Sequence, residues 1–362
     1  MPRIVIERDP ALRVAAAVLD PSGPEERRRA YADFLAHDEP DFAGWCQRLH
    51  ARIPGLYPAQ VIEVEDSAAL HKALPGADAV IVESLAIGEE ELTAAGKPLA
   101  FVQKFGGRTT NIDVAACKKR GIPVLTQKRR VNIAVAEHGF ALMIALAKRL
   151  NVLNGLVTDA GLREAGFRPD PFDRRYTVNS NFARVPGLKT LYGSTLGALG
   201  LGEVGADVAS RARAFGMTVL YHQRRQLPAA DEAALGVTYA TRDELLRRSD
   251  FISLHLPLNN ETRGFIDRRA FAQMKPGAVL INIARSELVD YNDLLDALRQ
   301  KRLGGFGLDT GYKEPAPEDE PLRTFKEVLL TPHTAPAGRE NVLRDMEEMC
   351  LKMWGALRRA PA

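Results

Sequence analysis

The sequence predicts an α/β fold with two lobes, each built on a parallel β-sheet. The chain has 362 residues, of which 46% are hydrophobic, and this is too long for one ordinary domain but enough for two cores. Short apolar runs alternate with amphipathic helical segments along the whole sequence. Because parallel strands need a crossover connection that is usually a helix, this alternation predicts parallel sheets with helices on both faces.

The expected strands are short apolar runs bounded by turn-forming or polar residues. They are Arg3 to Glu7, Ala79 to Glu83, Ala100 to Lys104, Val124 to Thr126, Thr195 to Leu199, Thr218 to His222, Phe251 to Leu254, Ala278 to Asn282, Gly305 to Leu308 and Val328 to Leu330.

Three longer segments organise the chain around these strands. The apolar segment Val135 to Leu150 is predicted to be a buried helix that links the two lobes. A final helix from Gly338 onward is expected to return to the first lobe. The stretch Leu162 to Val185 is rich in Arg, Pro, Asn and Asp and is predicted to be a surface excursion.

Composition excludes several classes of function. Lys and Arg number 49 against 46 Asp and Glu, and a formal charge of +3 gives no case for a nucleic-acid binder. The three cysteines, Cys46, Cys117 and Cys350, lack metal-ligand spacing, which indicates a reducing compartment and no metal site. The N-terminus has no secretion signal, and we find no 18-residue apolar stretch, so we expect a cytoplasmic protein that does not span a membrane.

A glycine-rich turn follows the expected strand Thr195 to Leu199. The residues are Gly200, Leu201, Gly202, Glu203, Val204 and Gly205, and they lead into a helix. In this context GxGxxG predicts a Rossmann-type nucleotide-binding turn, in which the glycines give a tight turn, backbone approach to a pyrophosphate and close helix packing. The alternative is a strand-to-helix turn without a ligand. The Glu203 side chain would repel phosphate, so we expect it to point to solvent.

The residues after the next strand bear on which cofactor is bound. Sites that prefer NAD carry an acid about 20 residues after the glycines, to hold the ribose 2′-hydroxyl. Here the strand Thr218 to His222 is followed by Gln223, Arg224 and Arg225. Two guanidinium groups without an acid favour a 2′-phosphate, so NADP is the preferred cofactor and NAD the alternative. Otherwise these arginines are solvated residues at a strand end.

Motifs downstream of the glycines resemble those of the D-isomer-specific 2-hydroxyacid dehydrogenases. They are SDFISLHLPLNNETRGFIDRRAFAQMKPGAVLINIARSELVD, GGFGLDTGYKEP and LLTPHTAPAGRE, and the resemblance runs from about Ala79 to about Asp345. It implies two Rossmann-like or flavodoxin-like lobes. A discontinuous substrate domain would comprise residues 1–132 and 334–362, and an NAD(P)-binding domain, residues 133–333, would be inserted into it.

The resemblance also implies a catalytic set. The family's arginine maps onto Arg285, its glutamate onto Glu314 and its histidine onto His333. A guanidinium fork can hold the substrate carboxylate and polarise the ketone, so Arg285 would anchor the substrate. His333 would give a proton to the developing alkoxide, or accept one in the reverse direction, and Glu314 would favour its charged ring. Glu314 argues against formate as a substrate.

Other family positions fall on the cofactor side of the site. Asp309 matches the aspartate that meets the nicotinamide carboxamide, and Ile283 and Ala284 directly precede Arg285. His255 and Pro257 match a strand end beside the adenosine, although plain packing explains them equally well.

The first lobe departs from the family pattern in its substrate loop. Where the family has small residues whose N–H groups receive the carboxylate, this chain has Phe105, Gly106, Gly107 and Arg108. Further along, the basic run Lys128 to Arg130 replaces a neutral turn. These cations could create a pocket for a second carboxylate or a phosphate on the substrate. The alternatives are a solvated basic rim, or a clasp for the NADP phosphate from across the cleft or from a neighbouring subunit.

The resemblance therefore implies hydride transfer between a nicotinamide and the C2 carbon of a small 2-oxo or 2-hydroxy acid, by an enzyme that is a homodimer. Two other functions remain open. One is a nucleotide-sensing, corepressor-like interaction protein on the same fold, and the other is a phosphonate-type dehydrogenase with the same Arg, Glu and His set.

Overall fold

Residues 1–10, 12–336 and 338–359 are described by a computed structural model, in which the chain forms two compact units. Unit 1 comprises Met1–Asn132 and Pro336–Ala362, and unit 2 comprises Ile133–Ala335. All paired strands in both units are parallel, as an α/β fold with parallel sheets requires. The predicted fold class is confirmed.

Unit 1 is built on a five-stranded sheet with the order β2-β1-β3-β4-β5. The strands are β1 (Arg3–Glu7), β2 (Gln60–Val64), β3 (Ala79–Val82), β4 (Phe101–Lys104) and β5 (Val124–Leu125). The strand order reverses between β1 and β3, and ligands of open parallel sheets bind beyond the carboxyl ends of the strands at such a point.

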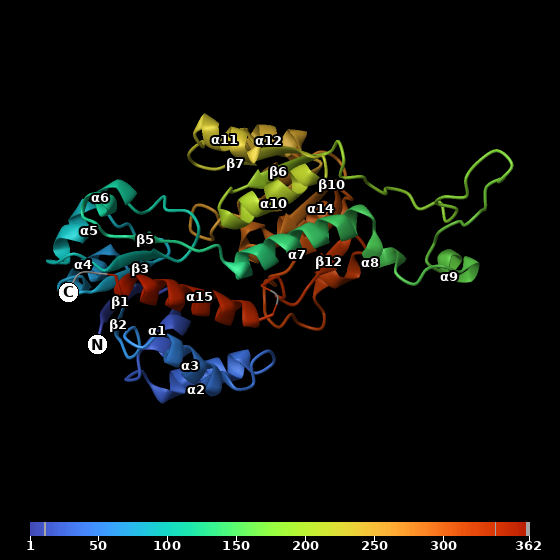
Figure 1. Cartoon of the computed structure of the whole chain (residues 1–362). Helices are drawn as coiled ribbons and strands as arrows, with labels where there is room; N and C mark the ends of the chain where they lie inside the picture. Colours follow the sequence, from blue (N-terminus) through green and yellow to red (C-terminus); the bar gives the residue numbers. More distant parts are fainter. Residues whose placement is uncertain (11, 337, 360–362) are drawn as a thin grey trace. The chain divides into compact units, whose positions relative to one another are not determined.

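Helices cover both faces of the unit 1 sheet. One face carries α1 (Arg13–Leu19), α2 (Glu25–Leu35), α3 (Phe42–Arg52) and α15 (Glu340–Leu357), and the other carries α4 (Ser67–Ala73), α5 (Glu89–Ala94) and α6 (Val114–Lys119). The returning helix α15, red in Figure 1, buries Leu343, Met346 and Met353 against this core. Their helical spacing gives α15 one apolar stripe, which is why it docks along the sheet.

Unit 2 contains a seven-stranded sheet with the order β12-β11-β10-β9-β6-β7-β8. Its strands are β6 (Thr195–Leu199), β7 (Thr218–His222), β8 (Thr238–Tyr239), β9 (Phe251–Leu254), β10 (Ala278–Asn282), β11 (Leu303–Leu308) and β12 (Val328–Leu330). The order reverses between β6 and β9, so the glycine turn after β6 lies at the switch point of this sheet.

The helices of unit 2 also pack on two faces. The faces are covered by α7 (Arg130–Ala147) with α10 (Glu203–Ala214), and by α12 (Arg242–Arg248), α13 (Arg268–Gln273) and α14 (Tyr291–Arg299). The short helix α11 (Ala229–Leu235) lies between β7 and β8 in sequence.

Helix α7 is long and apolar enough to cross a membrane by length and composition alone, contrary to the expectation that no such stretch exists. Phe140, Met143 and Leu146 of this helix are buried in the core of unit 2, and Gly139 lies against Ile283. These contacts explain its apolar composition as that of a core helix.

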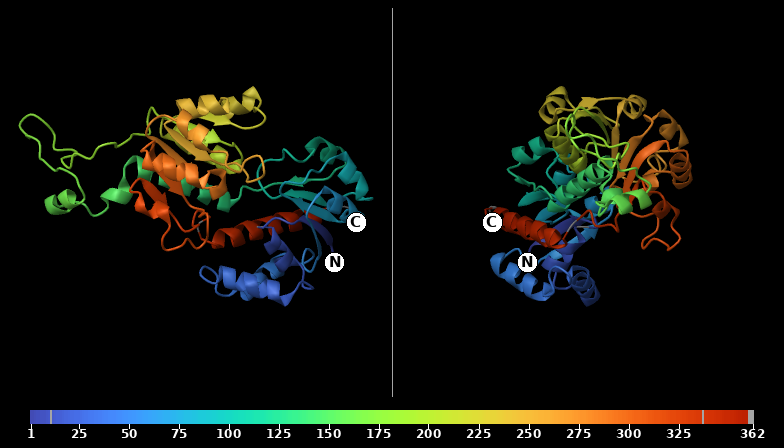
Figure 2. Two further views of the ribbon diagram at one scale, coloured as in Figure 1. Left: turned by 180° about the vertical axis from the view of Figure 1, so that it is seen from behind. Right: turned by 90° about the vertical axis from the view of Figure 1, so that its right-hand side faces the viewer.

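The segment after α8 (Leu150–Leu153) extends from the body of unit 2 and carries the small helix α9 (Asp159–Glu164) (Figures 1 and 2). It includes the predicted surface excursion. Val157, Tyr176 and Val178 are each more than three-quarters exposed on it.

Most strand positions agree with the sequence prediction, but β2 and β8 were missed. Strand β2 is a half-exposed edge strand, and β8 has only two residues, so neither has a continuous apolar run. The link helix begins at Arg130 rather than Val135 and ends at Ala147, and the last helix begins at Glu340 rather than Gly338.

Candidate active site

The glycine turn connects β6 to α10 and is shaped by two close backbone approaches. Gly200 has φ of +93°, and a Cβ there would lie 2.8 Å from the carbonyl oxygen of His255. A Cβ on Gly205 would collide with the carbonyl oxygen of Gly200. These two glycines are therefore required by the fold of the turn itself.

Gly202 differs from its neighbours because nothing lies within 4 Å of where its Cβ would be. It caps the N-terminus of α10, where first-turn N–H groups lack intrahelical acceptors. Open space in front of such N–H groups fits the pyrophosphate of a dinucleotide. Leu201 is buried, and Val204 and Glu203 are half-buried. We expected the Glu203 side chain to point to solvent, and its half-buried position meets that expectation only in part.

Two of the candidate cofactor residues after β7 are free of strong contacts. The Arg224 side chain is 91% exposed, and its ion pair with Glu261 is long, at 3.9 Å. Arg225 is also exposed, and its carbonyl accepts a hydrogen bond from the Gln223 side chain at 2.8 Å. No Asp or Glu stands among residues 223–225.

His255 follows β9 beside the glycine turn. Both of its ring nitrogens are buried and have no hydrogen-bond partner among the described residues, although the residue as a whole is partly exposed. Burial lowers the pKa of His255 to about 4, so the ring is neutral near neutral pH. Pro257 lies in the exposed turn that follows, where its carbonyl accepts from Thr262.

The candidate catalytic residues follow three neighbouring strands. Arg285 comes after β10, Glu314 after β11 and His333 after β12, and these strands are adjacent and parallel. All three residues therefore belong to the same edge of the unit 2 sheet.

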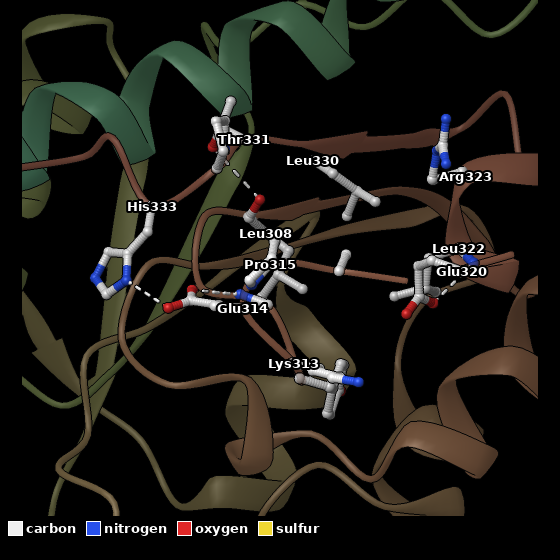
Figure 3. A pocket seen from close by; sticks show the side chains of 14 residues that line it. Leu308, Lys313, Glu314, Pro315, Glu320, Leu322, Arg323, Leu330, Thr331 and His333 are labelled. Carbon is white, nitrogen blue, oxygen red and sulfur yellow. Dashed lines mark hydrogen bonds and ion pairs between the residues drawn. The ribbon is translucent and has the colours of Figure 1, made fainter. Parts of the chain in front are cut away.

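His333 and Glu314 are in direct contact. The distance between His333 Nδ1 and Glu314 Oε2 is 3.0 Å, and Figure 3 shows the ring directed at the carboxylate. The other Glu314 oxygen accepts from the Gly311 backbone N–H at 2.9 Å. The His333 side chain is 44% exposed, which leaves its second ring nitrogen available to a substrate.

Arg285 has an exposed side chain whose guanidinium donates to the Ala284 carbonyl at 2.7 Å. Ala284 is half-buried and Ile283 is buried against α7. The next residue, Ser286, donates its hydroxyl to the Gly311 carbonyl at 3.1 Å. It thereby ties the Arg285 turn to the Glu314 loop.

The backbone at His333 is held by Asp309. His333 has φ of +54°, a left-handed conformation that costs on the order of 1–3 kcal/mol for a residue with a side chain. The buried Asp309 carboxylate accepts from the N–H groups of Thr334 and Ala335, each at 2.9 Å. The Asp309 carbonyl also accepts from the N–H of His333 at 2.8 Å.

Two further residues that sequence reasoning missed support Asp309. The Thr331 hydroxyl donates to Asp309 Oδ1 at 2.6 Å. His138 of α7 reaches the same hydroxyl through Nε2 at 2.9 Å, and since that hydroxyl proton is given to Asp309, His138 is the donor. The only sequence signal was the position of His138 in the VAEHG segment of the apolar helix.

A pocket of about 560 Å³ lies beside the His333–Glu314 pair (Figure 3). Its wall is largely apolar and is formed by residues of the Glu314 loop, the end of β11 and the segment after β12, including Leu308, Tyr312, Leu322, Leu330 and Pro332. Among the described residues, no group of three or more His, Cys, Asp or Glu side chains could hold a metal ion.

In unit 1, the candidate substrate loop follows β4. Phe105 is buried, Gly107 is exposed and Arg108 is half-buried. Gly106 has φ of +153°, and its carbonyl accepts a hydrogen bond from the Gln127 N–H at 3.0 Å.

The basic run does not act as one cluster. Arg130 contacts the carboxylates of Asp345 and Glu348 at 2.8 Å each, so it fastens the start of α7 to α15 within unit 1. The charge of Arg130 is thus compensated by two carboxylates, while its side chain stays 37% exposed.

Known proteins resemble the chain over most of its length. Residues 140–335 match the family described as D-isomer specific 2-hydroxyacid dehydrogenase, NAD binding domain. A D-3-phosphoglycerate dehydrogenase from Mycobacterium leprae is 35% identical over 77% of this chain and 49% of its own length. The chain thus spans about half the length of this relative. A glyoxylate reductase from Korarchaeum cryptofilum is 36% identical over 72% of this chain and 74% of its own length.

Solved structures show the same architecture. The TT0316 protein from Thermus thermophilus is 28% identical, with a TM-score of 0.52 over 98% of this chain and 97% of its own. A D-mandelate dehydrogenase from Rhodotorula graminis shares the fold at 20% identity, with a TM-score of 0.56 over 97% and 93% of the two chains. By its sequence, the chain belongs to the D-isomer-specific 2-hydroxyacid dehydrogenase family.

Proposed function

We propose that the chain is an NAD(P)-dependent oxidoreductase that interconverts a 2-oxo acid and a D-2-hydroxy acid. The observation that carries the proposal is the 3.0 Å contact between His333 and Glu314, on the sheet edge that also carries Arg285. The family membership and the names of the relatives, dehydrogenases and reductases of small hydroxy acids, support the same reaction class. We assign residues 133–333 to cofactor binding, and residues 1–132 and 334–362 to the substrate domain.

Each residue of the set has a distinct task. The Arg285 guanidinium binds the substrate carboxylate and polarises the C2 carbonyl, because it is always charged and has forked donors. A bound nicotinamide supplies or accepts the hydride at C2. His333 donates a proton to the C2 oxygen in reduction and accepts it in oxidation. Glu314 holds the ring by its Nδ1 and stabilises its charged form.

The cofactor is proposed to lie on the glycine turn, with the pyrophosphate before Gly202. The exposed Arg224 and Arg225 favour a 2′-phosphate, so NADPH is preferred over NADH. Asp309 is proposed to support the nicotinamide end by fixing the His333 turn and offering its remaining acceptor capacity to the carboxamide. His255 and Pro257 are proposed to lie at the adenosine end.

The test is the initial rate of NADPH and NADH oxidation with glyoxylate, hydroxypyruvate and larger 2-oxo acids. Replacing Arg224 and Arg225 together with Gln should raise the KM for NADPH by about tenfold or more and leave that for NADH within about twofold. Cofactor-dependent binding of a partner protein without turnover would instead support a nucleotide-sensing, corepressor-like protein. Oxidation of phosphonate-type donors alone would support a phosphonate-type dehydrogenase. A cytoplasmic homodimer without membrane or nucleic-acid partners remains the prediction for the assembly.

A further inference from the structure

His138 of helix α7 lies against the segment that leads to His333, and both residues belong to unit 2. Its Nε2 is 2.9 Å from the Thr331 hydroxyl and 3.4 Å from Oδ1 of Asp309. The side chain is 22% exposed, so most of it is enclosed by protein. The proposed reaction gives His138 no task, although hydrogen bonds connect it to the backbone of His333.

The hydrogen bonds of this group run in one direction. The Thr331 hydroxyl is 2.6 Å from Asp309 Oδ1 and 3.5 Å from the Leu308 carbonyl, so its single proton goes to the much closer carboxylate. The hydroxyl oxygen then accepts from His138, whose Nε2 must carry a proton. Because each donor in such a chain strengthens the next bond, His138 favours donation to Asp309 over the alternative at Leu308.

Asp309 transmits this order to the His333 turn. Its side chain is buried, and its two oxygens accept from the N–H groups of Thr334 and Ala335. Its carbonyl accepts from the N–H of His333 at 2.8 Å. His333 has φ of +54°, and a left-handed residue with a side chain persists only where surrounding contacts over-determine it. The contacts that hold Asp309 therefore also set how His333 presents its ring.

The helix that carries His138 is fixed in the core of unit 2. Phe140 is buried there, and a Cβ on Gly139 would lie 2.6 Å from Cδ1 of Ile283. This close approach packs α7 directly against the strand end that precedes Arg285. The donor at His138 therefore starts from a fixed backbone, as a residue that positions another must.

We propose that His138 is a positioning residue for His333, which fixes the His333 turn through the Thr331 hydroxyl and the Asp309 carboxylate. The inference rests on the proposed function and adds a residue to it. A proton donor must meet the C2 oxygen within hydrogen-bond reach, and small misplacements of such a group are costly. His138 acts only through other residues, so its loss slows the chemical step and leaves binding of the acid and the cofactor little changed.

The test is steady-state reduction by NADPH of the 2-oxo acid that the wild type turns over best. His138→Leu removes the donor and should lower kcat about tenfold, with the KM values of the acid and of NADPH within about twofold. His138→Gln places an amide N–H at about the reach of Nε2, and kcat should stay within about threefold of the wild type. A side chain that only filled space would give the two variants similar rates.

Thr331 allows a second break in the same chain. Thr331→Val removes the hydroxyl and should lower kcat by about tenfold or more, whereas Thr331→Ser keeps the hydroxyl and should retain most of the activity. The double variant His138→Leu with Thr331→Val should have a kcat within about threefold of Thr331→Val alone, because both changes break one chain. Two independent sites would instead multiply their losses.

Glu137→Gln is the matched control. Glu137 precedes His138 on α7, its side chain is 63% exposed, and it pairs with Arg211 at 3.1 Å. This variant should change neither kcat nor KM. Thermal unfolding and the number of NADPH molecules bound per chain show whether each variant is folded. If His138→Leu does not fold, Thr331→Val against Thr331→Ser gives the same comparison.

Four results would overturn the inference. They are a His138→Leu variant as active as the wild type, equal losses in His138→Leu and His138→Gln, a rise in KM without a fall in kcat, and losses that multiply in the double variant. In each case the wild type still turns over an acid, so the proposed function stands. Absence of turnover by the wild type with every acid would refute the proposed function, and this inference with it.

Discussion

The imidazole of His333 contacts the carboxylate of Glu314, with 3.0 Å between Nδ1 and Oε2, while a second Glu314 oxygen is held by the Gly311 N–H. The carboxylate is thus fixed on one side by backbone and turned to the ring on the other. This arrangement orients the ring, and a fixed ring orientation is what the proposed proton donor to a 2-oxo acid requires.

Glu314→Gln should lower kcat for reduction by about 10- to 100-fold, because an amide keeps a polar contact but cannot stabilise an imidazolium. Steady-state rates of NADPH oxidation with a 2-oxo acid measure the effect. Glu318→Gln, on the exposed part of the same loop, is the control and should match the wild type. Equal rates in Glu314→Gln and the wild type would contradict the assigned role.

Gly202→Ala and Gly205→Ala should have different effects. Gly202 has open space where the Cβ would be, so alanine should change the free energy of unfolding by less than about 1 kcal/mol while raising the Kd of NADPH about tenfold or more. Gly205→Ala forces a contact with the Gly200 carbonyl and should destabilise the fold by about 1–3 kcal/mol. Chemical denaturation and fluorescence titration measure the two quantities. Unchanged nucleotide affinity in Gly202→Ala would place the pyrophosphate elsewhere.

His255 should make the fold sensitive to acid. Burial lowers its folded-state pKa to about 4, below the ordinary value of 6.5. The unfolded chain therefore binds a proton first, and stability is lost as the pH falls from 6.5 towards 4, by up to roughly 3 kcal/mol. His255→Leu should remove this part of the loss, whereas His37→Gln, at an exposed site, should not. Unfolding free energies at pH 7 and pH 4.5 give the comparison, and parallel losses in wild type and His255→Leu would contradict it.

Asp345 should be important for stability because it receives the backbone N–H and the guanidinium of Arg130, each at 2.8 Å. Asp345→Leu should cost about 1–3 kcal/mol, since it leaves the helix N-terminus without its acceptor and the Arg130 guanidinium with Glu348 as its remaining partner. Adding Arg130→Met should restore part of that loss. A double variant less stable than Asp345→Leu would show that the pair is not coupled in this way.

Local sequence patterns were enough to predict the sheets and the sheet edge that carries Arg285, Glu314 and His333. Strand composition and the glycine turn are local, and parallel topology then brings the strand ends together. The supporting contacts were beyond this approach because they join distant residues without a local pattern. His138 meets Thr331 from 193 positions away, and Arg130 meets Asp345 from 215 positions away.

The basic run Lys128 to Arg130 shows the same limit within three adjacent residues. Their charges are identical in sequence, yet Arg130 is tied to α15 while Arg129 stacks on Phe105. The sequence does not show which of these side chains lies beside a carboxylate and which lies beside a ring. That difference depends on residues that are distant along the chain. Edge strands such as β2 were missed for a related reason, since their half-exposed residues carry a weak apolar pattern.

The most direct test of the account is the rate of NADPH and NADH oxidation with a panel of 2-oxo acids, measured for the wild type and for Arg285→Ala. We predict turnover of at least one acid by the wild type, faster with NADPH, and a loss in kcat/KM of about 10²-fold or more in Arg285→Ala, because the anchor of the carboxylate and carbonyl is gone. Absence of turnover with every acid despite measurable nucleotide binding, or an Arg285→Ala variant as active as the wild type, would contradict the central claim.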